Sequence, residues 1–171
     1  MTGNRRRFVL TAEGMAAIPQ PEPQDILSTV DLLCPAEGRG FMILEEDSTD
    51  GLGDYVQAAG GRDGSAGVSR VSVERRLYPR LERGEPDLRQ PHQHFVAGLW
   101  TGDVTQVTRI ATNGYHVTVR DNEVLHPRDI VRVMVAFLDS RTLPTAYRWR
   151  SIREEVERII RESGASSPMH G

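Results

Sequence analysis

The sequence contains no lysine, only one cysteine and no long apolar run. All 21 basic residues are arginine, which we attribute to codon usage in a G+C-rich genome such as that of an actinobacterium. The single cysteine, Cys34, excludes an internal disulfide and a zinc site built from several thiolates. No apolar stretch approaches the ~20 residues needed to cross a bilayer.

The N-terminal segment NRRRFVL (4–10) has the paired arginines of an export signal but not the apolar segment that must follow. Glu13, Gly14 and three prolines interrupt it. We therefore expect a cytoplasmic protein. The formal net charge of −3 over 171 residues gives no reason to expect nucleic acid or a membrane surface as a partner.

Motifs that would indicate catalysis are missing. The glycine-rich stretch GGRDGSAG (60–67) precedes a strand-like segment and has no lysine, so it does not match a phosphate-binding loop. Ser65 lacks the first glycine of a nucleophile elbow. Paired acidic catalysis stays open, because sequence alone does not show which carboxylates converge. We expect a protein that is not an enzyme and holds no cofactor.

The order of periodic segments predicts an α+β fold. Ile26, Leu27, Val30 and Leu33 have helical spacing. About six strand-like segments follow, including a hairpin with arms at 105–112 and 115–120 around the Asn-Gly turn signal. Helices are then expected at 130–139 and about 153–163. This pattern predicts one antiparallel sheet of five or six strands with helices packed on one face.

The expected domain organisation has three parts. Residues 1–24 form a basic arm and a proline-rich spacer, residues 25–163 form a single domain, and residues 164–171 form a disordered tail. In the main helix, Phe137 and Leu138 belong to the expected buried face, and Trp149 is expected to pack back over that helix.

The stretch LEEDSTDGLGD (44–54) contains five carboxylates and no basic residue. One interpretation is a solvated turn. The other is an acidic surface that fits a basic, nucleic-acid-binding cleft of another protein and accelerates association with it. The residues proposed for this contact are Glu45, Glu46, Asp47, Asp50 and Asp54.

Two further features are candidates for binding. Trp100 follows a strand beside a turn and is predicted to anchor a partner together with an exposed loop at 80–91, because tryptophan is frequent among residues that dominate binding energy. His92 and His94 are spaced to point the same way on a strand, and His116 is a conceivable third metal ligand. The alternative for the histidines is two polar residues at an exposed strand start.

Several stretches resemble a known family. YVQAAGG, VSVERRL, NGYHVTVRDNEVL and above all AFLDSRTLPTAYRWRSI (136–152) are similar to bacterial polymorphic-toxin immunity proteins, in particular those found beside secreted nucleic-acid deaminase toxins. The resemblance covers about residues 54–152. It implies a small α+β protein that binds a cognate toxin, blocks its active site and has no catalytic residues.

Two alternatives to an immunity protein remain at this point. One is a metal-dependent enzyme or metal-binding domain using His92 and His94, and the other is a chaperone or adaptor for a secreted substrate. The sequence leaves open the toxin's chemistry, the surface that contacts it, the role of the N-terminal arm and whether the free protein dimerises.

Overall fold

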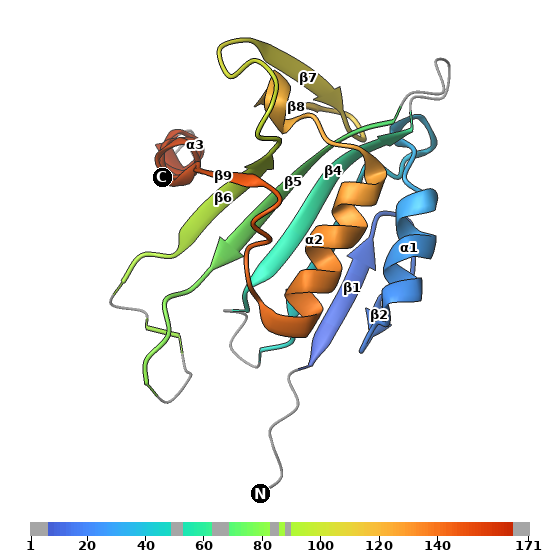
Figure 1. Cartoon of the computed structure of the whole chain (residues 1–171), viewed down its shortest axis with the longest axis vertical. Coiled ribbons are helices and arrows are strands. Elements are labelled where there is room, and N and C mark those ends of the chain that lie inside the picture. The colour runs from blue at the N-terminus through green and yellow to red at the C-terminus, as the bar shows by residue number, and fades with distance from the viewer. Residues whose placement is uncertain (1–6, 49–52, 63–68, 83–85, 88–89, 166–171) are drawn as a thin grey trace, which may run out of the picture.

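The structure, a computed structural model, describes residues 7–48, 53–62, 69–82, 86–87 and 90–165 (Figure 1). Its centre is an antiparallel sheet of seven strands in the order β2–β1–β3–β4–β5–β6–β9. The strands are β1 (Phe8–Ala12), β2 (Ile18–Pro19), β3 (Phe41–Glu46), β4 (Tyr55–Arg62), β5 (Ser69–Leu77), β6 (Gln93–Gly98) and β9 (Arg148–Ser151). The predicted α+β fold is confirmed. The sheet exceeds five or six strands because two short edge strands, β2 and β9, extend it.

Two helices cover one face of the sheet, α1 (Pro23–Asp31) and α2 (Pro127–Ser140) (Figure 1). Helix α2 begins three residues before the expected start, because Pro127 occupies its first position and Asp129 accepts a hydrogen bond from the His126 N–H at 2.9 Å. A third helix, α3 (Arg153–Ala165), contacts β6 instead. Short 3₁₀ turns lie at η1 (Pro35–Glu37) and η2 (Asp121–Glu123).

The alternation of side chains along the strands gives the two faces of the sheet different chemistry. The face beneath α1 and α2 carries the apolar core, which includes Leu10, Leu44, Val56 and Val73, all almost fully buried. The opposite face carries polar residues at the alternate positions, which include Glu45, Gln57, Glu74 and His94. The face beneath α1 and α2 therefore stabilises the fold, and the opposite face carries polar side chains that can contact a ligand or partner.

The predicted Asn-Gly hairpin is confirmed, with strands β7 (Val107–Ala111) and β8 (His116–Arg120). Gly114 has φ +85°, a left-handed conformation that glycine adopts without steric cost. The hairpin forms a separate two-stranded sheet. It cannot continue the main sheet beside β5, because Leu125 pairs there with Val71. Figure 1 shows it above the end of the main sheet.

The folded domain begins earlier than expected from the sequence. Strand β1 lies inside the sheet, where it pairs with β2 and β3, and the Phe8 ring contacts the Phe137 ring at 5.4 Å between centroids. Residues 8–12 are thus part of the sheet and its core, which corrects the expected arm over 1–24. The predicted basic segment at 1–6 and tail end at 166–171 lie outside the described residues. No helix among the described residues is long and apolar enough to span a membrane.

Candidate partner-binding surfaces

The predicted acidic surface is divided by the fold. Asp54 is fully buried and forms ion pairs with Arg141 and, at 3.3 Å, with Arg80. Glu46 accepts a hydrogen bond from Arg80 at 2.7 Å. The prediction that Asp54 faces a partner is therefore wrong, because its carboxylate is buried beneath α2 between two arginines. Glu46 is partly exposed and pairs with the same two arginines, Arg80 and Arg141.

This network joins segments that are distant in the sequence. Arg141 follows the end of α2, and Arg80 follows β5. Asp54 also accepts a hydrogen bond from the Tyr78 backbone N–H at 2.7 Å. No local pattern indicated these pairs, since the arginines are 26 and 87 residues away from Asp54 in the chain. The pairs fix the end of the sheet from which the remaining acidic residues project.

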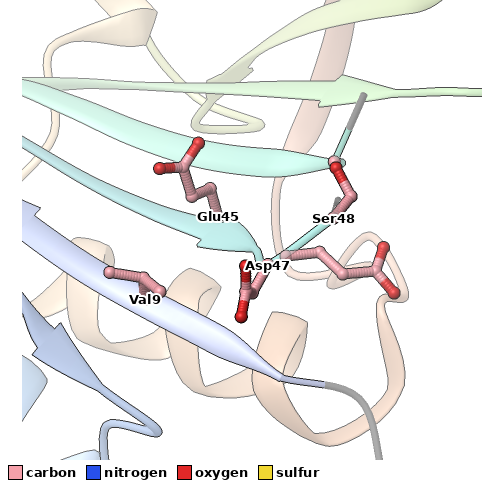
Figure 2. Close-up of a pocket in the computed structure, with 6 residues that line it drawn as sticks. Val9, Glu45, Asp47 and Ser48 are labelled. Atoms are coloured by element: carbon pink, nitrogen blue, oxygen red, sulfur yellow. The ribbon is translucent and has the colours of Figure 1, made fainter. Parts of the chain in front are cut away.

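Glu45 and Asp47 form what we call the acidic rim. They border a small pocket of about 130 Å³ together with Val9, Glu46, Ser48 and Gly53, and Figure 2 shows them at the end of β3 beside Val9 of β1. Neither carboxylate pairs with a cation among the described residues. Asp50, also predicted for this contact, lies outside the described part of the chain. The rim keeps two negative charges on the face opposite the helices.

Trp100 lies in the loop after β6, and 69% of its surface is exposed. Its indole N–H donates a hydrogen bond to the carbonyl of Thr145 at 3.2 Å. Thr145 belongs to the segment between the end of α2 and β9. The ring is thus accessible to a partner, and the hydrogen bond, which no sequence signal indicated, holds it in one orientation.

The rest of this loop, residues 99–106, is also held by specific contacts. The side-chain amide of buried Asn122 donates a hydrogen bond to the Leu99 carbonyl at 3.2 Å, and the backbone carbonyl of Asn122 accepts one from the Leu99 N–H at 2.7 Å. The carboxylate of Asp103 accepts hydrogen bonds from the Thr105 hydroxyl at 2.6 Å and from the Thr105 N–H at 2.7 Å, and these two bonds lower the pKa of Asp103. We call residues 99–106 the Trp100 loop. Because it is already ordered, binding through it costs little conformational entropy.

The Trp100 loop and the acidic rim lie at opposite ends of the sheet. Strand pairing aligns Glu45 with Tyr55, Arg76 and His94 across neighbouring strands. Trp100 comes six residues after His94, or roughly 20 Å further at ~3.3 Å per residue. The predicted site is thus two separate surfaces. The loop 80–91, the third part of the predicted interface, lies only partly within the described residues, and Asp87 in it is buried.

The histidine pair lies at the start of β6, and its two members differ. His94 is buried, with Nε2 3.3 Å from a carboxylate oxygen of Glu74. The His92 ring packs against the Tyr78 ring, with 5.8 Å between the ring centroids. Partial burial, with the nearby charges of His94 and Arg76, lowers the pKa of His92. The interpretation of both histidines as exposed is therefore wrong for His94.

His116, the conceivable third metal ligand, lies on β8 and is exposed. Within the described residues there is no group of three or more His, Cys, Asp or Glu side chains placed to hold a metal ion. His92 and His94 remain close to each other, with ring centroids 6.2 Å apart.

The structural residues pack as their spacing indicated. Phe137 is fully buried, and Leu138 and Trp149 are partly buried against the core. The sequence missed Arg75, whose fully buried guanidinium lies over the Phe137 ring and donates to the Thr142 carbonyl at 2.5 Å. Burial lowers the pKa of Arg75 to about 10. Arg75 continues the period-two pattern of Val71 and Val73, which was the available signal.

Comparison with protein-family models, with curated proteins and with solved structures found no match. The geometry of the chain's own surfaces therefore carries the functional conclusion.

Proposed function

We propose that this protein is an immunity protein, a non-catalytic inhibitor that binds a cognate secreted toxin domain and occludes its active site. The toxin would be a deaminase or another enzyme that acts on nucleic acid, and the inhibitor would act in the cytoplasm of the cell that makes both. The proposal starts from the sequence resemblance over about residues 54–152.

The observation that carries the proposal is the geometry of Trp100. An exposed indole ring loses more apolar surface on binding than any other side chain, and tryptophan is enriched among residues that dominate interface energies. Here the ring is oriented in advance by its hydrogen bond to Thr145, within the segment of strongest resemblance. A fixed aromatic anchor on an ordered loop is what an inhibitor needs for a tight, stoichiometric complex.

The acidic rim supports the choice of partner. An enzyme that acts on nucleic acid has a basic cleft, because phosphate contacts supply much of its affinity. Glu45 and Asp47 present two unpaired carboxylates among the described residues, in a position set by the buried network of Asp54. Charges at such a rim mainly raise the association rate. We expect the rim to steer the encounter and the Trp100 loop to hold the complex.

The test begins with isolation of the tagged protein from its native host and identification of what co-purifies. The toxin domain of the captured protein is then expressed in a sensitive strain, with and without this chain. Survival only in the presence of this chain is the expected result. The W100A variant should bind at least tenfold more weakly, because a central anchor contributes about 2 kcal/mol or more, and it should protect poorly.

Two controls make the result specific. Y115A removes another exposed aromatic ring, on the turn between β7 and β8, and should protect like the natural protein. Reversal of Glu45 and Asp47 to Arg should slow association and leave dissociation nearly unchanged. A captured partner that is harmless on its own would favour the adaptor or chaperone. Absence of a partner, with one metal ion bound per chain and lost in H94A, would favour the metal-binding alternative.

A further inference from the structure

A groove of about 630 Å³ lies on the face of the sheet opposite α1 and α2. Strand β8 forms one wall and the Val156 and Ile159 side of α3 forms the other, with Val96 and Arg150 in the floor. Ile159 is 57% exposed, so apolar surface borders the groove without being covered. The Trp100 loop and the acidic rim do not line it.

The edge of β8 borders this groove, with Val107 of β7 beside it at the Arg120 end. All five residues from His116 to Arg120 line it, although alternate side chains of a strand point to opposite faces. The hairpin bonds Thr112 N–H to the Tyr115 carbonyl and Asp121 N–H to the Gln106 carbonyl.

The hydrogen-bonding pattern shows which backbone groups face the groove. In an antiparallel pair every second residue bonds to the partner strand, so positions 115, 117, 119 and 121 bond to β7. The N–H and carbonyl groups of His116 and Thr118 therefore point away from β7. The next outward N–H, that of Arg120, is bonded to Glu123 at 2.9 Å. Among the described residues, His116 and Thr118 thus leave two positions of this strand edge without a neighbouring strand, and such an edge is a template for an added strand.

The cations on the two walls of the groove select the occupant. In the floor, Arg150 pairs with Glu123 at 2.6 Å and with Glu155 at 2.8 Å. Glu74 accepts a hydrogen bond from the neutral amide of Gln57 at 2.8 Å, which holds its carboxylate toward β4 without cancelling its charge. Arg120 on the β8 wall and Arg158 on the α3 wall have no carboxylate partner in the described ranges. An extended segment between the walls would thus meet one guanidinium on each side and apolar side chains of α3.

We propose that the groove binds an extended acidic segment of a partner protein, which adds as a strand to the edge of β8. Its backbone would bond to His116 and Thr118, its carboxylates would meet Arg120 and Arg158, and its apolar side chains would cover Val156 and Ile159. This mode of recognition takes its affinity from main-chain hydrogen bonds and its specificity from side-chain contacts. It does not rest on the proposed immunity function, because it uses a different surface.

The test uses two fluorescein-labelled heptapeptides, one of alternating Glu and Val and one of alternating Lys and Val. Fluorescence anisotropy should show that the acidic peptide binds the full chain at least tenfold more tightly than the basic one. The R120E/R158E variant should reverse this preference. The matched control R109E/R128E changes the net charge equally at exposed positions outside the groove and should keep the original preference.

Hydrogen exchange followed by NMR distinguishes strand addition from loose electrostatic attraction. The acidic peptide should slow exchange of the His116 and Thr118 amides and leave the bonded Val117 amide unchanged. The proposal is overturned if the natural chain does not prefer the acidic peptide, if R120E/R158E keeps that preference, or if these two amides stay unprotected in the complex. The exchange measurement on the natural chain holds whether or not the double variant folds.

Discussion

The buried hydrogen bond between Tyr147 and Asp129 makes the stability of the protein depend on pH in the alkaline range. The phenol donates to the carboxylate at 2.7 Å and ties the segment after α2 to the first turn of that helix. Burial, with the hydrogen bond to Asp129 next in size, raises the pKa of Tyr147 to about 12. The folded chain thus disfavours the phenolate.

The sign and size of the effect follow from linkage. Because the folded pKa lies above the unfolded value of about 10, the contribution is fully present below pH 10 and is lost as the pH rises from about 10 to about 12. The rise in the pKa of Tyr147 from about 10 to about 12 corresponds to roughly 3 kcal/mol, at ~1.4 kcal/mol for each pH unit. The natural protein should lose that much free energy of unfolding across this interval through Tyr147 alone.

The Y147F variant tests both the hydrogen bond and its titration. At pH 7 it should be less stable by about 2 kcal/mol, the value of a hydrogen bond to a charged group, and its Tm should fall by roughly 5 °C. It has no phenol to ionise, so its stability should fall less between pH 10 and 12. The difference between the two proteins should therefore shrink and approach zero near pH 12.

Urea unfolding followed by circular dichroism, at intervals from pH 7 to 12, measures this difference. The control Y115F removes the hydroxyl of an exposed tyrosine and should unfold like the natural protein at every pH. Two curves that stay parallel from pH 9 to 12 would refute the assignment of the alkaline loss to Tyr147. An unchanged Tm at pH 7 would show that the hydrogen bond contributes nothing net.

Two further substitutions test the scaffold of the surfaces. D54N keeps the acceptor for the Tyr78 N–H but leaves Arg80 and Arg141 without a buried carboxylate, and should lower the free energy of unfolding by about 3–5 kcal/mol; exposed D47N should change it by less than about 0.5 kcal/mol. G60A should cost more than about 3 kcal/mol, since its Cβ would lie 2.3 Å from the Arg70 carbonyl oxygen at φ +110°. G14A, with open space around its Cβ, should cost only about 1–2 kcal/mol. Urea unfolding measures all four, and equal losses within either pair would contradict the packing described.

The fold class was predictable where a segment carries its own signal. The Asn-Gly turn fixed the hairpin, and the apolar spacing from Ile130 to Phe137 fixed α2, since both depend on residues close in the sequence. Strand β9 was not predictable from local pattern. It is four residues long, and its pairing with β6 depends on a contact about 53 residues apart.

The candidate surfaces were predictable only in part, for a related reason. A count of carboxylates in 44–54 says nothing of which face each one takes or of which arginine reaches it. Alternation along β3 places Glu45 and Glu46 on opposite faces, so that Glu45 is a rim charge and the partly exposed Glu46 pairs with Arg80. The groove beside β8 depends on α3, whose position no sequence pattern gave.

The two tryptophans, which bind neighbouring backbone carbonyls, give the protein an intrinsic fluorescence signal. Trp100 and Trp149 donate to adjacent carbonyls, Thr145 and Pro144, yet one ring is exposed and the other partly buried. Unfolding moves Trp149 into water and shifts its emission to longer wavelengths, whereas Trp100 is already in water. Covering Trp100 would shift emission the other way. In unlabelled protein, unfolding should therefore shift the tryptophan emission maximum to longer wavelengths, and binding of a partner over Trp100 should shift it to shorter wavelengths.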